Sequence, residues 1–503
     1  MEASEVELKF ELSEEALPAL GEHAAFAAPA ETSQLRSVYF DTPGYTLKSA
    51  GFGLRVRRDE DSFVQTLKSG KAANPLTRRE WESQITGERP DPAALADTPA
   101  AKILDGDGGA LEPVFTTAVE RTRRLWTRGK NVVEISLDRG EITSGVRHEP
   151  IFELELELKA GSPRALFELA GALSQHTRMP LLFQSKAERG YHLAMDPSWA
   201  PQRAESAALA PETPVAKAFG DIARSCLAQV ANNARLLRRC RSLEALHQMR
   251  VGLRRFRAAL TAFRALVEDR EFARLKAESE WLAGELDAAR DVDVFIHEGF
   301  RGARPAGEDR EAFARLGACL LQAQTRAYER ALTALDSPRF VDFMLMAVRW
   351  LEMGDWLRSD EPVLRGLREG RTDEFARDRL DRMRRQVRKR GRRLARLDSE
   401  SRHRLRIKAK KLRYTAEFFS GSFGLRTRRR RFFRALGDLQ DGLGRLNDVA
   451  VAPKLALERI RGQAADTGYA AGLIVADRRA SAPKAERAAL AAFEDFDSAK
   501  PFW

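Results

Sequence analysis

The feature that most constrains the fold is the segment IFELELELK at residues 151–159, in which glutamate alternates with apolar residues. Successive side chains of a β-strand point to opposite faces of a sheet, whereas helical residues share a face every three or four positions. The pattern therefore predicts a strand with leucines on one face and Glu153, Glu155 and Glu157 on the other. A row of like charges is unfavourable in a sheet unless cations face it. We therefore expect basic side chains nearby.

The same period of two recurs through the first 200 residues, in VELKFEL, FGLRVRR and NVVEISLD, with Gly, Pro and Asp turns between them. From about residue 212 the pattern changes to long Ala, Leu and Arg stretches with helical spacing. A Pro- and Ala-rich stretch separates the two regions. We predict a β-rich domain at 1–200, a linker at 201–214 and an all-α domain at 215–503, the last with repeats at about 215–360 and 370–503.

Charge separates the same two regions. The whole chain carries a net charge of +12, but residues 1–200 hold 24 Lys and Arg against 31 Asp and Glu, and residues 201–503 hold 61 against 42. The helical region therefore favours polyanionic partners. No apolar run approaches the ~20 residues of a membrane span, and the acidic N-terminus does not follow the order of a signal peptide. With three cysteines in no metal-ligand spacing, we expect a cytoplasmic protein that does not associate with a membrane.

The helical region repeats itself. HQMRVGLRRFR at 247–257 matches HRLRIKAKKLR at 403–413, and LDAARDVDV at 286–294 matches LGRLNDVAV at 443–451. A duplicated helical bundle is the economical explanation. Residues three, four and seven apart share one face of a helix, so each histidine heads a stripe of cations. The two stripes are His247, Arg250, Arg254 and Arg257, and His403, Arg406, Lys410 and Arg413.

Like charges at helical spacing repel, so these stripes need a ligand that offsets the repulsion. We predict that the two stripes face each other across a groove that binds long-chain polyphosphate, because a row of cations gains many charge-assisted contacts with a phosphate chain. The competing interpretations are structural histidines and a generic basic surface that takes DNA equally well. Sparse aromatic residues argue against sequence-specific reading of nucleic acid. For the basic runs at 384–393 and 426–431, an extension of the groove and a solvated helix face stay equally open.

Charged residues recur at period two in several of the expected strands. The competing interpretation is the solvated face of an antiparallel sheet. If the sheet closes into a barrel, the same rows line its interior. Carboxylates are ligands for Mg²⁺ or Mn²⁺, and Arg and Lys bind phosphate oxygens, so such a lumen fits a metal-bound polyanion. The rows comprise Glu5, Glu7, Lys9, Arg55, Arg57, Lys68, Glu80, Glu82, Arg121, Arg123, Glu134, Asp138, Glu153, Glu155, Glu157 and Lys186.

The motifs EVELK, RVRR, TLK, EWE, LDRG, ELELELK and SKAERGY, in this order, resemble the CYTH family, the triphosphate tunnel metalloenzymes, over roughly residues 3–195. The duplicated helices, with ARDVDV and LNDVAV, resemble the CHAD domain, a histidine-containing helical domain that binds polyphosphate, over roughly residues 215–500. The resemblance implies an antiparallel β-barrel with outer helices, followed by a duplicated helical bundle. It also implies metal-dependent hydrolysis of inorganic triphosphate to pyrophosphate and phosphate, with Mg²⁺ or Mn²⁺ as the cofactor.

The resemblance assigns roles residue by residue. The metal ligands that it implies are Glu5, Glu7, Glu153 and Glu155. Arg121 competes with Arg123 for one phosphate-binding position, because RTR can be read in either register. The phosphate-binding set is Arg55, Arg57, Lys68, Arg121, Arg123 and Lys186. The catalytic set is Glu5, Glu7, Lys9, Arg55, Arg57, Lys68, Arg123, Asp138 and Lys186.

No Ser-His-Asp or Cys-His arrangement and no Gly-rich phosphate loop is visible in the sequence. Hydrolysis of a phosphoanhydride needs none of them, since charge neutralisation, in-line positioning and an activated water are enough. Two other functions stay open. One is a non-catalytic protein that tethers polyphosphate, and the other is a triphosphatase acting on an organic triphosphate such as thiamine triphosphate. An adenylyl cyclase is a further relative to exclude.

Overall fold

The computed structural model describes residues 3–59, 62–69, 77–105, 110–195, 200–205, 209–301, 307–460 and 465–503. Side chains are described for most of these, but not for residues 3–5, 59, 77–78, 298, 308, 450–460 and 465–466. The chain forms two compact units. Unit 1 comprises Met1–Gln202 and Asp336–Met353, and unit 2 comprises Arg203–Leu335 and Gly354–Trp503.

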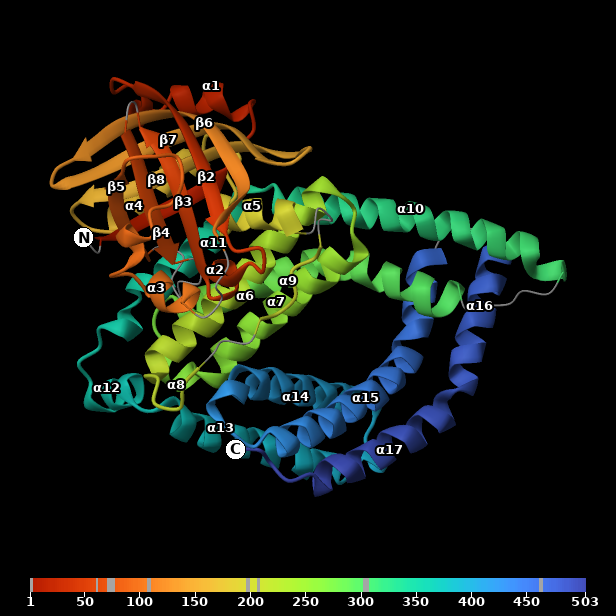
Figure 1. Cartoon of the computed structure of the whole chain (residues 1–503). Helices are drawn as coiled ribbons and strands as arrows, with labels where there is room; N and C mark the ends of the chain where they lie inside the picture. Colours follow the sequence, from red (N-terminus) through yellow and green to blue (C-terminus); the bar gives the residue numbers. More distant parts are fainter. Residues whose placement is uncertain are drawn as a thin grey trace. The chain divides into compact units, whose positions relative to one another are not determined.

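The described part of unit 1 contains a closed barrel of antiparallel strands in the order β1-β5-β4-β3-β2-β6-β7-β8 (Figure 1). β1 closes the barrel, because it pairs with β5 on one side and with β8 on the other. The predicted antiparallel barrel is therefore confirmed. The strands are β1 (Ala3–Glu11), β2 (Glu31–Asp41), β3 (Phe52–Asp59), β4 (Ser62–Ser69), β5 (Thr77–Ile85), β6 (Glu112–Arg128), β7 (Asn131–Ser144) and β8 (Arg147–Ala160).

The barrel turns its apolar residues outward and its charged rows inward. On β3, Leu54 and Val56 are buried in a cluster with residues of the outer helices, while Arg55 and Arg57 line the interior. The strand alternation that appears in the sequence thus places the hydrophobic core between the barrel wall and the helices around it. The helices of unit 1 are α1 (Ala16–Gly21), α2 (Thr46–Ser49), α3 (Pro99–Leu104), α4 (Arg164–Ser174), α5 (Lys186–Met195) and α11 (Pro338–Met353).

Helix α5 packs on β6, β7 and β8 and carries Lys186 at its start. Its close approach depends on Gly190, because a Cβ at that position would overlap the ring of Phe115. Helix α11 packs against α4, although 133 residues of unit 2 (203–335) separate it in the chain from the rest of unit 1. Its residues are buried along most of its length, including Phe343 and Trp350, which indicates a helix that is enclosed rather than amphipathic.

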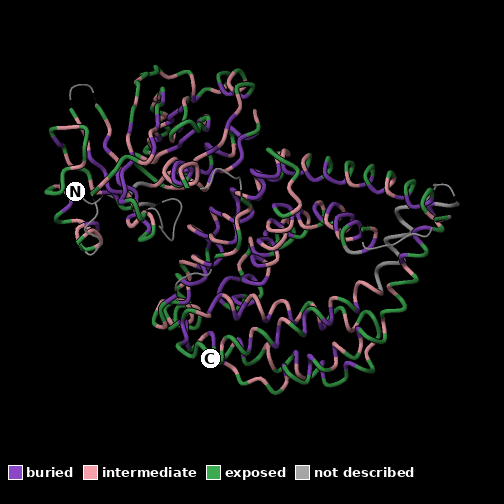
Figure 2. Tube along the Cα trace, turned by 45° about the vertical axis from the view of Figure 1, so that its right-hand side comes forward, coloured by how far each residue is buried: buried purple, intermediate pink, exposed green. Residues whose placement is uncertain are grey.

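Unit 2 is all α-helical and duplicated, which confirms the predicted class. The contacts of the first repeat, α6 with α7, α7 with α9 and α9 with α10, recur in the second as α13 with α14, α14 with α15 and α15 with α16. The helices are α6 (Val215–Arg239), α7 (Leu243–Ala262), α8 (Arg264–Val267), α9 (Phe272–Val294), α10 (Arg310–Leu335), α12 (Pro362–Glu369), α13 (Thr372–Gly391), α14 (Ser399–Phe418), α15 (Arg426–Ile460), α16 (Ala465–Ala480) and α17 (Ala482–Ser498). In Figure 2 their buried and exposed residues alternate along the turns.

The two repeats begin side by side. Pro214, before α6, forms a β-bridge with Arg371, before α13, and the backbone N–H of Thr372 donates to the carbonyl of Thr213 at 3.0 Å. The C-terminal end of the Pro- and Ala-rich stretch is thus tied to the start of the second repeat. Among the described residues, none of the helices is long and apolar enough to cross a bilayer.

Candidate active site

A cavity of about 260 Å³ lies inside the barrel. Every strand of the barrel and the start of α5 contribute to its wall, and all strands except β2 send charged side chains inward. The wall carries cations and carboxylates in close alternation. Of the residues predicted from the sequence, it includes Glu7, Lys9, Arg55, Arg57, Lys68, Arg121, Asp138, Glu155 and Lys186.

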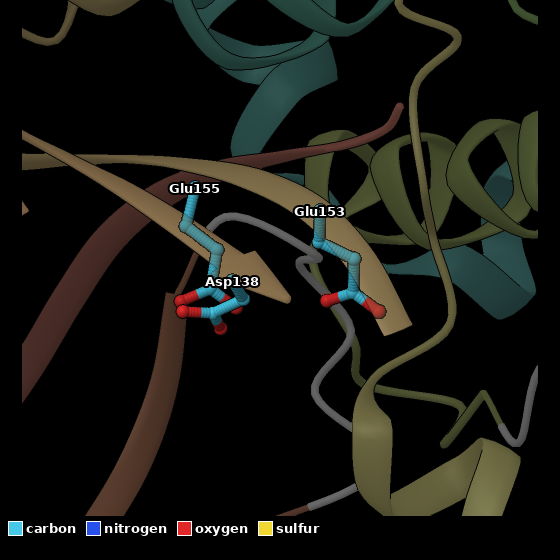
Figure 3. Close-up of side chains that lie close together, drawn as sticks. All are labelled: Asp138, Glu153 and Glu155. Carbon is cyan, nitrogen blue, oxygen red and sulfur yellow. The ribbon is translucent and has the colours of Figure 1, made fainter. Parts of the chain in front are cut away.

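A network of ion pairs surrounds Asp138, Glu153 and Glu155, each of which has a carboxylate oxygen within 4.8 Å of an oxygen of the other two (Figure 3). Lys186 Nζ contacts all three carboxylates, at 2.7 Å from Asp138, 2.7 Å from Glu153 and 2.9 Å from Glu155. Arg121 donates to both oxygens of Asp138 and to Glu155, each at 2.6 Å. The three buried carboxylates therefore fix the positions of Lys186 and Arg121 at the cavity wall.

This network shifts the pKa values of Glu155 and Lys186. Burial alone would raise the pKa of Glu155, but Lys186, Lys9 and Arg121 lower that pKa well below its ordinary value. Burial alone would lower the pKa of Lys186, but Glu153, Glu155 and Asp138 raise it above its usual range. Each group is thus held in its charged form, which is the state that binds metal or phosphate.

Arg55 and Arg57 on β3 are neutralised much less. The Nε atoms of both guanidinium groups are buried without a hydrogen-bond partner, and Arg55 lies 3.9 Å from Glu82. The neighbouring charge of Arg55, together with burial, lowers the pKa of Arg57 to about 10. Two adjacent, partly unsatisfied guanidinium groups in one cavity have the donors and the charge to bind an anion.

In unit 2 the structure brings the two predicted stripes together, since α7 contacts α14. Burial and the charges of Arg406, Arg254 and Arg250 lower the pKa of Lys410 to about 7. Burial and the charges of Arg290 and Arg254 lower the pKa of His247 to about 4. Cations from both helices therefore converge in a partly buried region.

The members of the stripes differ in how they are neutralised. Ion pairs hold Arg250 to Asp287, Arg257 to Glu280 and Arg413 to Glu417. The Nε atoms of Arg254 and Arg406 are buried without a hydrogen-bond partner. His403 Nδ1 lies 2.7 Å from Asn447 Oδ1, so this histidine has a structural contact, with a residue of the second predicted repeat motif.

The comparison with known proteins follows the division into two units. The CYTH domain family matches residues 3–191, and the CHAD domain family matches residues 221–457. The chain carries a CYTH domain followed by a CHAD domain. An inorganic triphosphatase of Haemophilus influenzae is 31% identical over 194 residues, which are 38% of this chain and 54% of the relative. The chain thus matches about half the length of that relative.

A crystal structure of the CHAD domain from the plant Ricinus communis is 31% identical in sequence. It has a TM-score of 0.51 and covers 59% of this chain and 96% of its own. This likeness confirms the helical architecture of the CHAD unit and its assignment to the family.

Three further residues predicted for the CYTH barrel, Glu5, Arg123 and Glu153, are not part of the described cavity wall. Arg123 is on the same face of β6 as Arg121, but its side chain is 41% exposed and lies 3.6 Å from Glu31 rather than in the cavity wall. Of the two registers of RTR, the geometry thus favours Arg121. Glu153 is buried behind the wall, where it also pairs with Arg189. The side chain of Glu5 lies outside the described residues.

The cavity wall also contains three glutamates to which the sequence assigned no role in the site. Glu80 pairs with Lys68, Glu82 accepts a hydrogen bond from Thr66 at 3.0 Å, and Glu157 pairs with Lys159 at 2.7 Å. The sequence does show that Glu157 belongs to the alternating row of β8. It does not show the register of β8 against β1, which places Glu157 directly opposite Glu7.

The donors in the wall fit a hard divalent cation. Glu7 and Glu157 are cross-strand neighbours that both line the cavity and offer carboxylate oxygens, with Lys9 Nζ 2.9 Å from Glu7 and Lys159 Nζ 2.7 Å from Glu157. Glu155 lies in the same wall. Glu153 is packed between Lys186 and Arg189 and, unlike these three glutamates, is not part of the cavity wall.

Proposed function

We propose that the CYTH barrel hydrolyses inorganic triphosphate to pyrophosphate and phosphate. The observation that carries this proposal is the pair Arg55 and Arg57, whose guanidinium groups lack full neutralisation inside the barrel cavity. Carboxylates line the same cavity, as expected where a polyanion is bound together with a cation. The similarity to an inorganic triphosphatase supports the choice of substrate.

In this proposal two groups of cations in the cavity wall bind the phosphate chain. Arg55, Arg57 and Lys68 hold the phosphate chain from β3 and β4, while Arg121 and Lys186 approach it from the opposite wall. Asp138 is fully buried and bonded to both Arg121 and Lys186. It therefore orients these donors before substrate arrives, so that little reorganisation is needed as charge develops on the leaving phosphate.

We propose Mg²⁺ or Mn²⁺ as the cofactor, held by Glu7, Glu155 and Glu157. The ion would neutralise substrate oxygens and lower the pKa of a bound water. Glu157 takes the place of Glu153 in this set because only Glu157 lines the cavity. Glu153 would instead support Lys186, to which it lies at 2.7 Å. A cytoplasmic location, which the sequence predicts, is part of the proposal.

The test is the release of phosphate from tripolyphosphate by the purified full chain with Mg²⁺ or Mn²⁺. We expect Glu7→Ala and a chelator each to abolish release. Release that survives both would refute the proposal. Much faster turnover of thiamine triphosphate, of a nucleoside triphosphate, or of ATP to cyclic AMP would change the substrate that we assign. The proposed roles of the charged residues in the cavity would stand. No turnover with any metal or chain length, with polyphosphate binding retained, would identify a tethering protein instead.

For the CHAD unit we propose a groove between α7 and α14 that binds long-chain polyphosphate. The support is the pair Arg254 and Arg406, one from each repeat, whose buried Nε atoms have no partner. An extended phosphate chain would satisfy both and would offset the repulsion between them. We expect Arg254→Ala with Arg406→Ala to weaken polyphosphate binding while hydrolysis of tripolyphosphate in the barrel continues. Equal displacement by duplex DNA would point to a generic basic surface.

A further inference from the structure

A second basic cavity lies on unit 2, lined by the C-terminal half of α13, the turn after it and Lys408 of α14. Its volume is about 900 Å³, and we call it the outer hollow. The described lining contains no carboxylate and no aromatic ring. Lys408 is on α14 but two residues from both Arg406 and Lys410, so it points to a different side of the helix from the proposed groove.

Two stripes of cations run along α13 toward the outer hollow, and they differ in their partners. In the first, Arg388 pairs with Asp497, and Arg384 donates to the carbonyl of Ala499 at 2.7 Å. The second consists of Arg385 and Lys389, four residues apart on α13, and Arg393, which lies in the turn after the helix ends at Gly391. No ion pair or side-chain hydrogen bond joins these three to another described residue, and all three are exposed.

The second stripe has no explanation within the chain. Arg385 and Lys389 lie four residues apart on α13, where two like charges repel and destabilise the helix. The helix dipole favours cations in the last turn, at Arg388, Lys389 and Arg390, but does not reach Arg385 one turn earlier. Burial and the charge of Arg390, another cation of the lining, lower the pKa of Lys408 on α14, whose ammonium donates to Gln386 at 2.7 Å. An anionic ligand would relieve the repulsion between these cations.

We propose that the outer hollow is a second binding site for a phosphate chain, separate from the groove between α7 and α14. This inference rests on the proposed polyphosphate binding of the CHAD unit and adds a site to it. The hollow favours a thin, flexible polyanion, because a stiff duplex cannot follow a concave surface of this size. With no ring in the described lining, bases would find no stacking partner. A chain longer than the groove could engage both sides of α14.

The test compares two charge-matched variants of the full chain. The first, Arg385→Ala with Lys389→Ala and Arg393→Ala, removes the unpaired stripe. The control, Arg264→Ala with Arg382→Ala and Arg404→Ala, removes three exposed arginines of unit 2 that pair with acids on their own helices. Binding of polyphosphate of about 100 units is measured across a range of salt concentrations, with thermal unfolding to verify the fold.

We expect the first variant to lose about tenfold in affinity and the slope of log affinity against log salt to fall by about two, because three phosphate contacts are lost. The control should bind like the unaltered chain, and tripolyphosphate hydrolysis should be unchanged in both. The groove variant, Arg254→Ala with Arg406→Ala, should keep some binding of polyphosphate. Adding the three substitutions of the first variant, called the stripe variant below, should remove that remaining binding.

Equal binding by the stripe variant and the control would overturn the second site and leave the proposed groove intact. Duplex DNA that displaces polyphosphate from the hollow at equal phosphate concentration would also overturn it, in favour of a nucleic-acid surface. If the unaltered chain bound no polyphosphate at all, both the groove and the outer hollow would be refuted.

Discussion

Arg57 combines burial, a positive neighbour and an unsatisfied Nε atom, so its charge depends on a ligand for neutralisation. Its neighbour Arg58 is exposed, which makes the two a matched pair on one strand. We expect Arg57→Ala to lower kcat/KM for tripolyphosphate by about 10- to 100-fold, because a hydrogen bond to a charged group contributes about 1.5–3 kcal/mol. Arg58→Ala should change kcat/KM less than twofold by the same steady-state assay. Equal losses in the two variants would contradict an anion site on the inner face of β3.

Glu153 and Glu157 lie on the same face of β8, but substitution of the first should affect stability and substitution of the second should affect metal binding. Glu157→Gln should raise the Mg²⁺ or Mn²⁺ concentration needed for half-maximal activity by about tenfold or more, since a cavity-facing ligand is lost. Glu153→Gln should instead lower the melting temperature, because it removes a buried partner of Arg189 and Lys186 and leaves a charge uncompensated. A metal titration and thermal unfolding of both variants separate the two outcomes. A reversed result would restore Glu153 as the ligand.

At the scale of elements, α7 and α14 place Lys410 among cations, and Asp448 is the acid that partly offsets them. The pKa of Lys410 is about 7 in the folded protein and 10.5 in its ordinary state. Between these pH values the unfolded chain binds more protons than the folded one, so stability rises as the pH rises from about 7 to 10.5. A bound polyanion favours the protonated form of Lys410, so the affinity for the polyanion should fall as the pH rises.

We therefore expect polyphosphate affinity to fall by up to about tenfold as the pH rises through the pKa of Lys410, near 7. The measurement is a binding titration at constant ionic strength on either side of that pH. Lys410→Arg should keep its charge and flatten the dependence, because a guanidinium does not titrate in this range. A pH dependence that persists in Lys410→Arg would assign it to another group.

Elements with a local period were predictable from the sequence, and those set by distant contacts were not. The rows of β1, β3 and β8 and the stripes of α7 and α14 follow from periods of 2 and 3.6, which the sequence displays directly. The choice of Glu157 over Glu153 depends on the register between β1 and β8, and Arg121 over Arg123 on how far the cavity extends along β6. Neither the register nor the extent of the cavity can be read from the sequence of a single strand. The outer hollow likewise depends on which arginines Asp497 reaches.

At the scale of the whole molecule, α11 belongs to unit 1, while the chain before Asp336 and after Met353 belongs to unit 2. A helix that is apolar on most sides is predicted from its sequence to be a core helix. The sequence does not show in which of the two units that core lies. Arg178 also pairs with Asp336 at 2.9 Å, just before α11. The barrel unit is therefore completed by a segment from the middle of the helical region.

A fragment of residues 1–202 should accordingly be less stable than the same barrel in the full chain. We expect its melting temperature to be lower by about 10 °C, because several buried side chains are lost and each kcal/mol shifts the midpoint of a domain this size by about 2–4 °C. Addition of a synthetic peptide of residues 336–353 should recover part of the loss, whereas a scrambled peptide should not. A fragment that melts with the intact barrel would show that α11 adds nothing to it.

The placement of α11 also bears on how such a chain can be recombined. The backbone enters unit 2 after residue 202, returns to unit 1 at 336 and leaves again after 353. A crossover in the stretch at 201–214 would exchange the barrel but keep the old α11, so the new barrel would have to accept a foreign helix against its α4. Descendants of such an exchange would survive only where the two surfaces already matched, and the halves of this protein are therefore expected to be inherited together.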